Sequence, residues 1–186
     1  MTKRDAVLTD GVVTLRRWRR DDVPAIVAAC NDPQIARFLD HVPQPYGEAD
    51  GHAWLDVGER AWAGGTFAGF AIEVDGAAVG SISMELAEDD PRRAETGYWL
   101  AAGMRGRGLT TRALRLLARW AFEKYGLERL QLRADVDNLA SQRVAENAGF
   151  TREGVLRSYH YNPRVDRRVD FVMFSLLPEE VENSSS

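Results

Sequence analysis

The segment MRGRGLTTRAL, residues 104–114, combines glycines and arginines with the start of a predicted helix. Gly106 and Gly108 carry no Cβ atom, so the backbone can turn there and an anion can approach its N–H groups closely. The first turn of a helix adds N–H groups without intrahelical partners and the positive end of the helix dipole. A predicted strand at 94–101 precedes the segment. The segment therefore predicts a site for a phosphate-bearing cofactor, and a solvated loop with exposed arginines is the alternative.

Two better-known phosphate-binding loops do not fit this segment. No Gly-Lys-Ser/Thr follows the glycines, which excludes a Walker loop. The GRGLTT spacing lacks the third glycine of a dinucleotide-binding fingerprint, and no acidic residue ends the next strand at the expected distance. The interpretation as a phosphate site therefore depends on the other motifs of the chain.

Two motifs and a strand, in this order, resemble those of the GNAT acetyltransferase superfamily. RGRGLT resembles the acyl-CoA loop of that family, usually Gln/Arg-x-x-Gly-x-Gly/Ala, with Arg105, Gly108 and Thr110 in the matching positions. Thr110 departs from the small residue that is usual there, although its hydroxyl can donate to phosphate. NLASQRVAENAGF resembles the second signature, Asn-x-x-Ser-x-x-x-x-Glu-x-x-Gly-Phe, at Asn138, Ser141, Glu146, Gly149 and Phe150. AETGYWLA resembles the strand that holds the pantetheine arm.

The resemblance covers about residues 10–177 and is nearest to the RimJ/RimL branch, which acetylates protein N-terminal amines. It implies an α/β fold of the acyl-CoA N-acyltransferase type. In this fold a twisted, mostly antiparallel mixed sheet is flanked by helices, and two central parallel strands are splayed apart to admit acetyl-CoA. No metal is implied.

The resemblance also implies which residues bind acetyl-CoA. Backbone groups of Tyr98, Trp99 and Leu100 would hydrogen-bond the pantetheine arm as an added strand does, and Asn138 would contact the arm from the opposite wall. The pyrophosphate would be bound by the loop and the first helical turn, that is, by Arg105, Gly106, Arg107, Gly108, Leu109, Thr110 and Thr111.

Glu95 is the candidate general base. Direct acetyl transfer needs a neutral amine, whereas α-amines with a pKa near ~8 and lysine amines near ~10 are mostly protonated at neutral pH. Strand alternation places Glu95 on one face with Gly97 and Trp99, beside the expected gap. A carboxylate desolvated next to an indole is a stronger base. The alternative is a surface glutamate paired with Arg92 or Arg93.

Ser141 is the candidate acid for the leaving thiolate. It lies three residues after Asn138, so both side chains project from the same side of a predicted helix at 138–149. Alternatively, Asn138 caps that helix and Ser141 only satisfies the backbone of its first turn. A serine hydroxyl is a poor acid, so a hydrogen bond to the sulfur suits it better. Tyr98 and Tyr159 are alternative acids.

Other conspicuous residues fit a structural role at least as well as a functional one. Cys30 is predicted to be a core residue and not a nucleophile. The loop at 157–168, RSYHYNPRVDRR, either borders the mouth of the acceptor site or is a solvated hairpin loop. Four aromatic residues either line an acceptor pocket or, more often for such residues, pack in the core: Trp54, Trp62, Phe67 and Phe70.

Hydrophobic periodicity and turn signals predict the elements that position these residues. Asp75-Gly76 predicts a tight hairpin turn, and 87–93 is predicted to be a loop. The strongest helix, 109–126, presents an apolar face and ends at Gly126. The predicted strands are 12–18, 66–74, 77–86, 94–101, 127–136, 150–160 and 167–177. The predicted helices are 21–31, 34–39, 48–63, 109–126 and 138–149.

Length and composition bound the remaining questions. The 186 residues predict a single domain over 1–180 and a frayed polar tail over 181–186. A net charge of −4 without a basic block argues against bulk nucleic-acid binding. One cysteine excludes an intramolecular disulfide. No apolar segment has the length of a signal peptide or membrane span, so a cytoplasmic location is expected. The scattered histidines argue against a metal site: His41, His52 and His160.

The sequence therefore predicts an acetyl-CoA-dependent N-acetyltransferase with a primary-amine acceptor. A peptide or ribosomal N-terminus, an antibiotic and a polyamine all remain open as acceptors. One competing hypothesis is an acyl-CoA-binding regulator without turnover. Another is an RNA-binding loop protein, which the net charge of −4 disfavours. A homodimer is one option for the oligomeric state, because relatives are often dimers.

Overall fold

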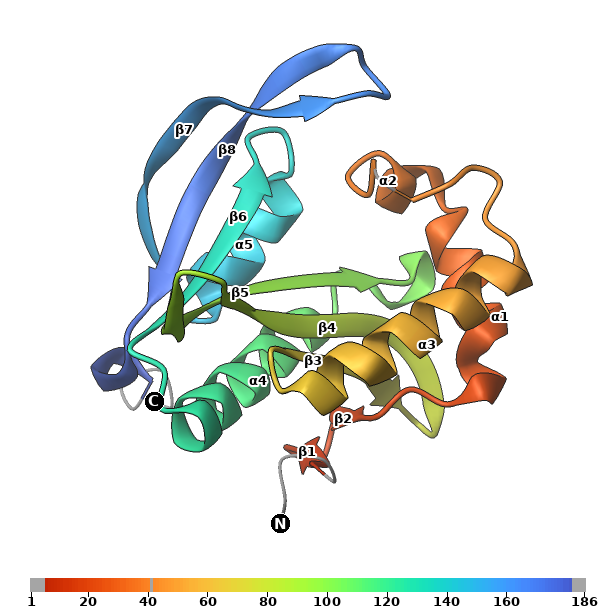
Figure 1. Cartoon of the computed structure of the whole chain (residues 1–186), viewed down its shortest axis with the longest axis horizontal. Coiled ribbons are helices and arrows are strands. Elements are labelled where there is room, and N and C mark those ends of the chain that lie inside the picture. The colour runs from red at the N-terminus through yellow and green to blue at the C-terminus, as the bar shows by residue number, and fades with distance from the viewer. Residues whose placement is uncertain (1–5, 41, 182–186) are drawn as a thin grey trace.

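The computed structural model describes residues 6–40 and 42–181, and one mixed sheet forms its centre (Figure 1). The strand order within these residues is β1-β2-β3-β4-β5-β6-β8-β7. The strands are β1 Leu8–Thr9, β2 Thr14–Arg16, β3 Phe67–Val74, β4 Ala77–Ala87, β5 Asp90–Leu100, β6 Arg129–Asp135, β7 Thr151–Asn162 and β8 Arg167–Leu176. The helices are α1 Val23–Cys30, α2 Pro33–Ala36, α3 Glu48–Gly64, α4 Leu109–Tyr125 and α5 Leu139–Asn147.

The predicted fold class is confirmed. All neighbouring strands pair antiparallel except β5 and β6, which are joined through α4 and run parallel. The short strand β1 was not predicted. Of the tail expected at 181–186, Val181 packs against the core, and the other residues lie outside the described part of the chain, as does His41.

The loop predicted at 87–93 is wrong, because β4 and β5 continue through most of it. They meet at a tight turn and pair as far as Ala87 and Asp90. The side chains of this extension are largely exposed, so backbone pairing defines it and burial contributes little. A hydrophobic pattern does not reveal strands of that kind.

Two hydrophobic clusters hold the sheet between its helices. Helix α4 packs on one face, where its Leu114 and Leu117 are fully buried against Phe70 of β3 and Ile82 of β4. Helices α1 and α3 enclose a smaller cluster on the other face, formed by Val23, Ile26, Cys30, Tyr46 and Leu55. Because side chains alternate along a strand, each strand between the helix layers contributes to both faces. The central strands are therefore fixed from both sides.

The outer strands form a hairpin that extends past the end of β6 and faces α2 (Figure 1). Arg164 in its connecting loop donates to the backbone oxygens of Leu39 at 3.3 Å and Val42 at 2.6 Å. Ser158 has a positive φ of 52° where the register shifts between Leu156 and His160. The hairpin is thereby bent and tied to the segment that follows α2.

The side chain of Glu153 on β7 connects three strands, β6, β7 and β8, at the base of this hairpin. Both of its oxygens accept from Arg129 of β6 at 2.7 Å, and Ser175 of β8 donates at 2.7 Å. Hydrogen bonding to Arg129, opposed by partial burial, lowers the pKa of Glu153 from its usual 4.5 to about 2. A carboxyl with a lowered folded-state pKa stabilises the fold above its unfolded pKa and loses that effect as the pH falls.

We therefore expect Glu153→Gln to lower the free energy of unfolding at pH 7 by about 1 kcal/mol or less, since the pair is partly exposed. The deficit should shrink as the pH falls from about 4.5 to about 2. Urea unfolding of wild type and Glu153→Gln at pH 7, 4 and 2.5 measures this difference in the free energy of unfolding. Glu128→Gln is the control, because Glu128 and its partner Arg92 are each 63% exposed and should contribute little at any pH. A deficit of equal size at all three pH values would contradict the ionic origin.

Candidate functional site

A cleft of about 380 Å³ opens where β5 and β6 separate. The two strands pair only from Arg93 and Arg129 to Glu95 and Gln131. Beyond that point β5 continues to Leu100 in register with β4 alone. The splayed central strands expected from the resemblance are therefore present.

The cleft crosses the sheet from one face to the other. Glu95 and Tyr98 are three residues apart on β5, so their side chains point to opposite faces. Both nevertheless line the cleft. The far walls come from β6, from the start of α5 and from the β7–β8 hairpin, with Phe38, Leu39 and Asp40 closing one side. Two reactants can thus approach one point from opposite faces.

The glycine loop directly follows β5 and supplies unpaired backbone donors. Gly106 and Gly108 have φ values of 74° and 73°, and Gly108 is the N-cap of α4. The N–H of Arg112 donates to the oxygen of Gly108 at 3.1 Å and begins the helix ladder. Within the described residues, no acceptor bonds the N–H groups of 106–111. A row of N–H groups at a helix start suits a pyrophosphate.

Arg105 is used differently from what its motif implies. Its Nε donates to the oxygen of Leu100 at 3.1 Å, and its Nη2 contacts Asp32 at 2.9 Å. Its Nη1 bonds Gln34, and its own N–H donates to Ala102 at 3.3 Å. The guanidinium therefore fixes the loop against the start of α2.

The other residues of the glycine loop differ in how far they are buried. Leu109 and Thr110 are 3% and 8% exposed, so their side chains are buried. Arg107 is exposed, with its Nη1 3.3 Å from the sulfur of Met104. Thr111 is half-buried. Arg107 is thus the exposed cation of the loop.

Glu95 lies in the cleft and is held by a pair of hydrogen bonds. Arg133 of β6 donates from Nε to Oε1 at 2.8 Å, and its Nη2 lies 2.5 Å from Oε2. Gln131 donates to Oε2 at 3.3 Å. The alternative prediction, that Glu95 pairs with Arg92 or Arg93, is wrong, because Arg92 pairs with Glu128 and Arg93 with Asp89. The parallel neighbour β6, which sequence spacing does not reveal, supplies the actual partner.

Ser141 and Tyr98 form one hydrogen-bonded pair. The Tyr98 hydroxyl lies 3.1 Å from Ser141 Oγ and 3.0 Å from the Ser141 backbone oxygen. Burial raises the pKa of Tyr98 to about 12, although the Ser141 hydrogen bond acts in the opposite direction. The phenol therefore remains a protonated donor at neutral pH. Asn138 Oδ1 accepts from the Ser141 N–H at 3.1 Å, so Asn138 caps α5 as the structural alternative predicted.

A histidine and an aspartate in the cleft were not predicted as site residues. His160 Nε2 lies 2.6 Å from Asp40 Oδ2, and both residues line the cleft. Tyr159, an alternative acid, bonds Arg133 through its hydroxyl. Asp40 and His160 lie far apart in the chain and belong to no local motif. Asp40 and His160 are neighbours only because the hairpin packs near the segment after α2, which the sequence does not reveal.

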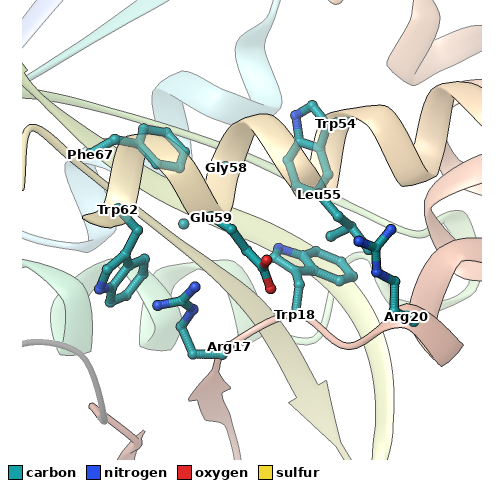
Figure 2. A pocket seen from close by; sticks show the side chains of 10 residues that line it. Arg17, Trp18, Arg20, Trp54, Leu55, Gly58, Glu59, Trp62 and Phe67 are labelled. Atoms are coloured by element: carbon teal, nitrogen blue, oxygen red, sulfur yellow. The ribbon is translucent and has the colours of Figure 1, made fainter. Parts of the chain in front are cut away.

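The remaining candidates are mostly structural. Cys30 is buried, and burial raises the pKa of its thiol to about 11, so it is an inert core residue as predicted. Trp62 and Phe70 are core residues at 4% and 0% exposure. Trp54 and Phe67, together with Trp62, line a separate pocket beneath α3, with Glu59 and Arg17 directed into it (Figure 2). At about 40 Å³ that pocket has room for only a few water molecules.

The predicted loop at 157–168 is mostly strand, and its stem borders the cleft through Tyr159, His160 and Asn162. No group of three or more His, Cys, Asp or Glu side chains suited to a metal occurs in residues 6–40 and 42–181. Across the same ranges, no helix combines the length and the apolar character needed to span a membrane.

Comparisons with known proteins agree with this geometry. The family model described as an acetyltransferase (GNAT) domain matches residues 13–151. The putative ribosomal N-acetyltransferase YdaF of Bacillus subtilis (strain 168) is 39% identical over 108 residues, which is 58% of this chain and 58% of YdaF. Spermidine N(1)-acetyltransferase of Escherichia coli (strain K12) is 31% identical over 152 residues, 77% of this chain and 75% of the relative.

A solved structure shares the fold at lower identity. Mycobacterium smegmatis RimJ in complex with CoA-disulfide superposes with a TM-score of 0.83 at 21% identity. The match covers 96% of this chain and 91% of that one. At this identity the likeness concerns the fold alone.

We expect inorganic pyrophosphate to shift the backbone amide resonances of 106–111 in an NMR titration, because these N–H groups have no acceptor in the described residues. Gly108→Ala should weaken the binding about fivefold, since a left-handed Ala costs about 1 kcal/mol. Gly103→Ala is the matched control, because a Cβ there meets open space and its φ is not positive. Resonance shifts that avoid 106–111 would contradict the assignment.

Proposed function

The chain belongs to the GNAT acetyltransferase family, whose members use acetyl-CoA, and we propose that it transfers the acetyl group directly to a primary amine. The RimJ/RimL-like branch expected from the sequence agrees with the relative YdaF, which is named a putative ribosomal N-acetyltransferase. The observation that carries the proposal is the split between β5 and β6, which opens a two-sided cleft beside the unpaired N–H groups of 106–111.

Acetyl-CoA fits the groups that this region leaves available. The pyrophosphate lies on the N–H groups of 106–111, with Arg107 as a nearby cation. The pantetheine arm runs along Tyr98–Leu100, because β4 pairs with this part of β5 on one side and β6 leaves the other side open. Asn138 lines the cleft and uses Oδ1 for the helix cap, so its amide N–H groups are the ones left to contact the arm. Arg105 acts as a positioning residue that holds the loop.

The reaction then takes place in the split. The amine nitrogen bonds to the thioester carbon, the C–S bond breaks, and the thiolate leaves with the electron pair. Ser141 donates a hydrogen bond to the departing sulfur, which is finally protonated from solvent, and Tyr98 positions Ser141 through its own hydrogen bonds. Glu95 takes the proton that the nitrogen loses as the C–N bond forms. Arg133 and Gln131 keep the carboxylate oriented, and Oε1, which accepts only from Arg133, retains a lone pair for this purpose.

A peptide N-terminal amine is our first choice of acceptor. The relative with the higher identity, YdaF, carries the name of a ribosomal N-acetyltransferase. Carboxylates of Asp40 and Asp135 line the cleft and attract a cationic amine. A polyamine is the second candidate, because the spermidine acetyltransferase matches more of this chain.

The first experiment supplies acetyl-CoA with a peptide bearing an N-terminal serine or with spermidine. Thiol release and a mass increase of one acetyl group on the peptide are expected. Acetylated spermidine alone would favour the polyamine. Binding of acetyl-CoA without thiol release across a wider amine panel would instead indicate a regulator, and absence of acetyl-CoA binding by calorimetry would overturn the proposal.

The second experiment replaces Glu95 with glutamine. A general base contributes about 10²–10⁴-fold, so kcat should fall by that amount while the Kd of acetyl-CoA stays unchanged. Glu85→Gln is the control, because Glu85 is the cross-strand neighbour of Glu95 on β4 and does not line the cleft. A normal kcat for Glu95→Gln across the pH range would remove Glu95 from the mechanism.

A further inference from the structure

The His160–Asp40 pair lies in the cleft but has no part in the reaction described above. The distance between His160 Nε2 and Asp40 Oδ2 is 2.6 Å, and the side chains are 42% and 9% exposed. The ring of His160 also packs against Phe171 of β8, with centroids 5.7 Å apart. One nitrogen of the ring is thus held by a sheltered carboxylate, while the ring itself remains open to the cleft.

This arrangement leaves a basic nitrogen on the ring. An ionised carboxylate only accepts hydrogen bonds, so the neutral imidazole carries its hydrogen on Nε2 and a lone pair on Nδ1. Among the described residues no group bonds Nδ1. A carboxylate that orients an imidazole in this way also stabilises the imidazolium that forms when the second nitrogen takes up a proton.

Attachment of the hairpin does not depend on this pair alone. Arg164 already ties the hairpin to the segment after α2 through the backbone oxygens of Leu39 and Val42. Arg164 does not line the cleft, whereas both members of the His160–Asp40 pair do. The pair in the cleft is therefore better explained by chemistry than by assembly.

We propose that His160, positioned by Asp40, removes the first proton of the acceptor ammonium before acetyl transfer. This inference rests on the proposed function. An ammonium loses two protons on its way to an amide, and Glu95 accounts for the second, which leaves as the C–N bond forms. His160 takes the first proton on Nδ1, becomes an imidazolium paired with Asp40, and releases the proton to solvent through its exposed edge. The neutral amine then attacks the thioester, and the thiolate leaves with the electron pair of the C–S bond.

The charges around His160 are defined by the cleft. Val169 and Phe171, which face it from β8, are uncharged. The titratable and charged groups that line the cleft with it, from its own strand and from the elements opposite, are Asp40, Glu95, Tyr98, Arg133, Asp135 and Tyr159. Glu95 and Arg133 neutralise each other, so Asp40 is the partner that acts directly on the ring.

The test compares kcat/KM of wild type and His160→Gln from pH 6 to pH 11, with acetyl-CoA and either the N-terminal serine peptide or spermidine. An α-amine of pKa ~8 is only about one-tenth neutral at pH 7. We therefore expect a loss of about tenfold at pH 7 that falls to within about twofold at pH 9. If spermidine is the acceptor, the recovery moves to about pH 10 or above, the range of alkyl amines. Asp40→Asn should show the same trend.

The controls separate chemistry from structure. His52→Gln removes a histidine that lies outside the cleft on α3, and it should match wild type at every pH. Arg164→Ala loosens the same segment without touching the pair, so any loss it causes should be the same at all pH values. Acetyl-CoA affinity should be unchanged in both His160→Gln and Asp40→Asn.

Three results would overturn the inference. His160→Gln and Asp40→Asn with wild-type activity at pH 7 would exclude the pair from the reaction. A loss that stays constant with pH, as for Arg164→Ala, would assign it a structural role. A wild-type protein that acetylates no amine would remove the proposed function, and this inference with it. If His160→Gln does not fold, Asp40→Asn alone decides between these outcomes.

Discussion

The separation of β5 from β6 after Glu95 and Gln131 is the constraint on which the rest of the structure depends. A central strand normally satisfies its backbone on both edges, and unpaired polar groups within a fold carry a free-energy cost. Here β5 continues to Leu100 with only β4 beside it. The open edge becomes a binding surface because β4 and the α4 core hold β5 in place from the other side. The cleft is thus produced by a missing set of strand pairs.

The polar residues of the cleft are arranged as pairs across this opening. Arg133 holds Glu95 from β6, Ser141 meets Tyr98 from α5, and Asp40 meets His160 of β7. The Ser141–Tyr98 and Asp40–His160 pairs join elements that no backbone pairing connects, and Arg133 contacts Glu95 from beyond the last pair of β5 with β6. The reactive groups are therefore oriented by side-chain partners, and loss of one partner disturbs both geometry and charge.

Most of the fold was predictable from local signals, and most of the site's partners were not. Asp75-Gly76, Gly126 and the apolar face of α4 act over a few residues, so periodicity and turn chemistry revealed them. The glycine loop was also identified correctly as a row of donors before a helix. The turn between β4 and β5 was missed because exposed, polar strand ends lack a hydrophobic pattern.

The missed contacts in the site have a common physical reason. Arg133, Asp40 and His160 become site residues only after strands distant in sequence have paired or returned across the molecule. Arg105 was expected to contact phosphate because of its motif. Its guanidinium instead donates hydrogen bonds to Leu100, Asp32 and Gln34. A motif predicts where a loop lies, whereas tertiary packing decides which of its side chains face the ligand.

The contacts of Arg105 have a consequence for the order in which reactants meet the protein. They join the glycine loop to the segment that begins at Asp32 and continues to Asp40 in the opposite wall of the cleft. Under the proposed function, a nucleotide that binds the loop would also restrain that wall before the amine arrives.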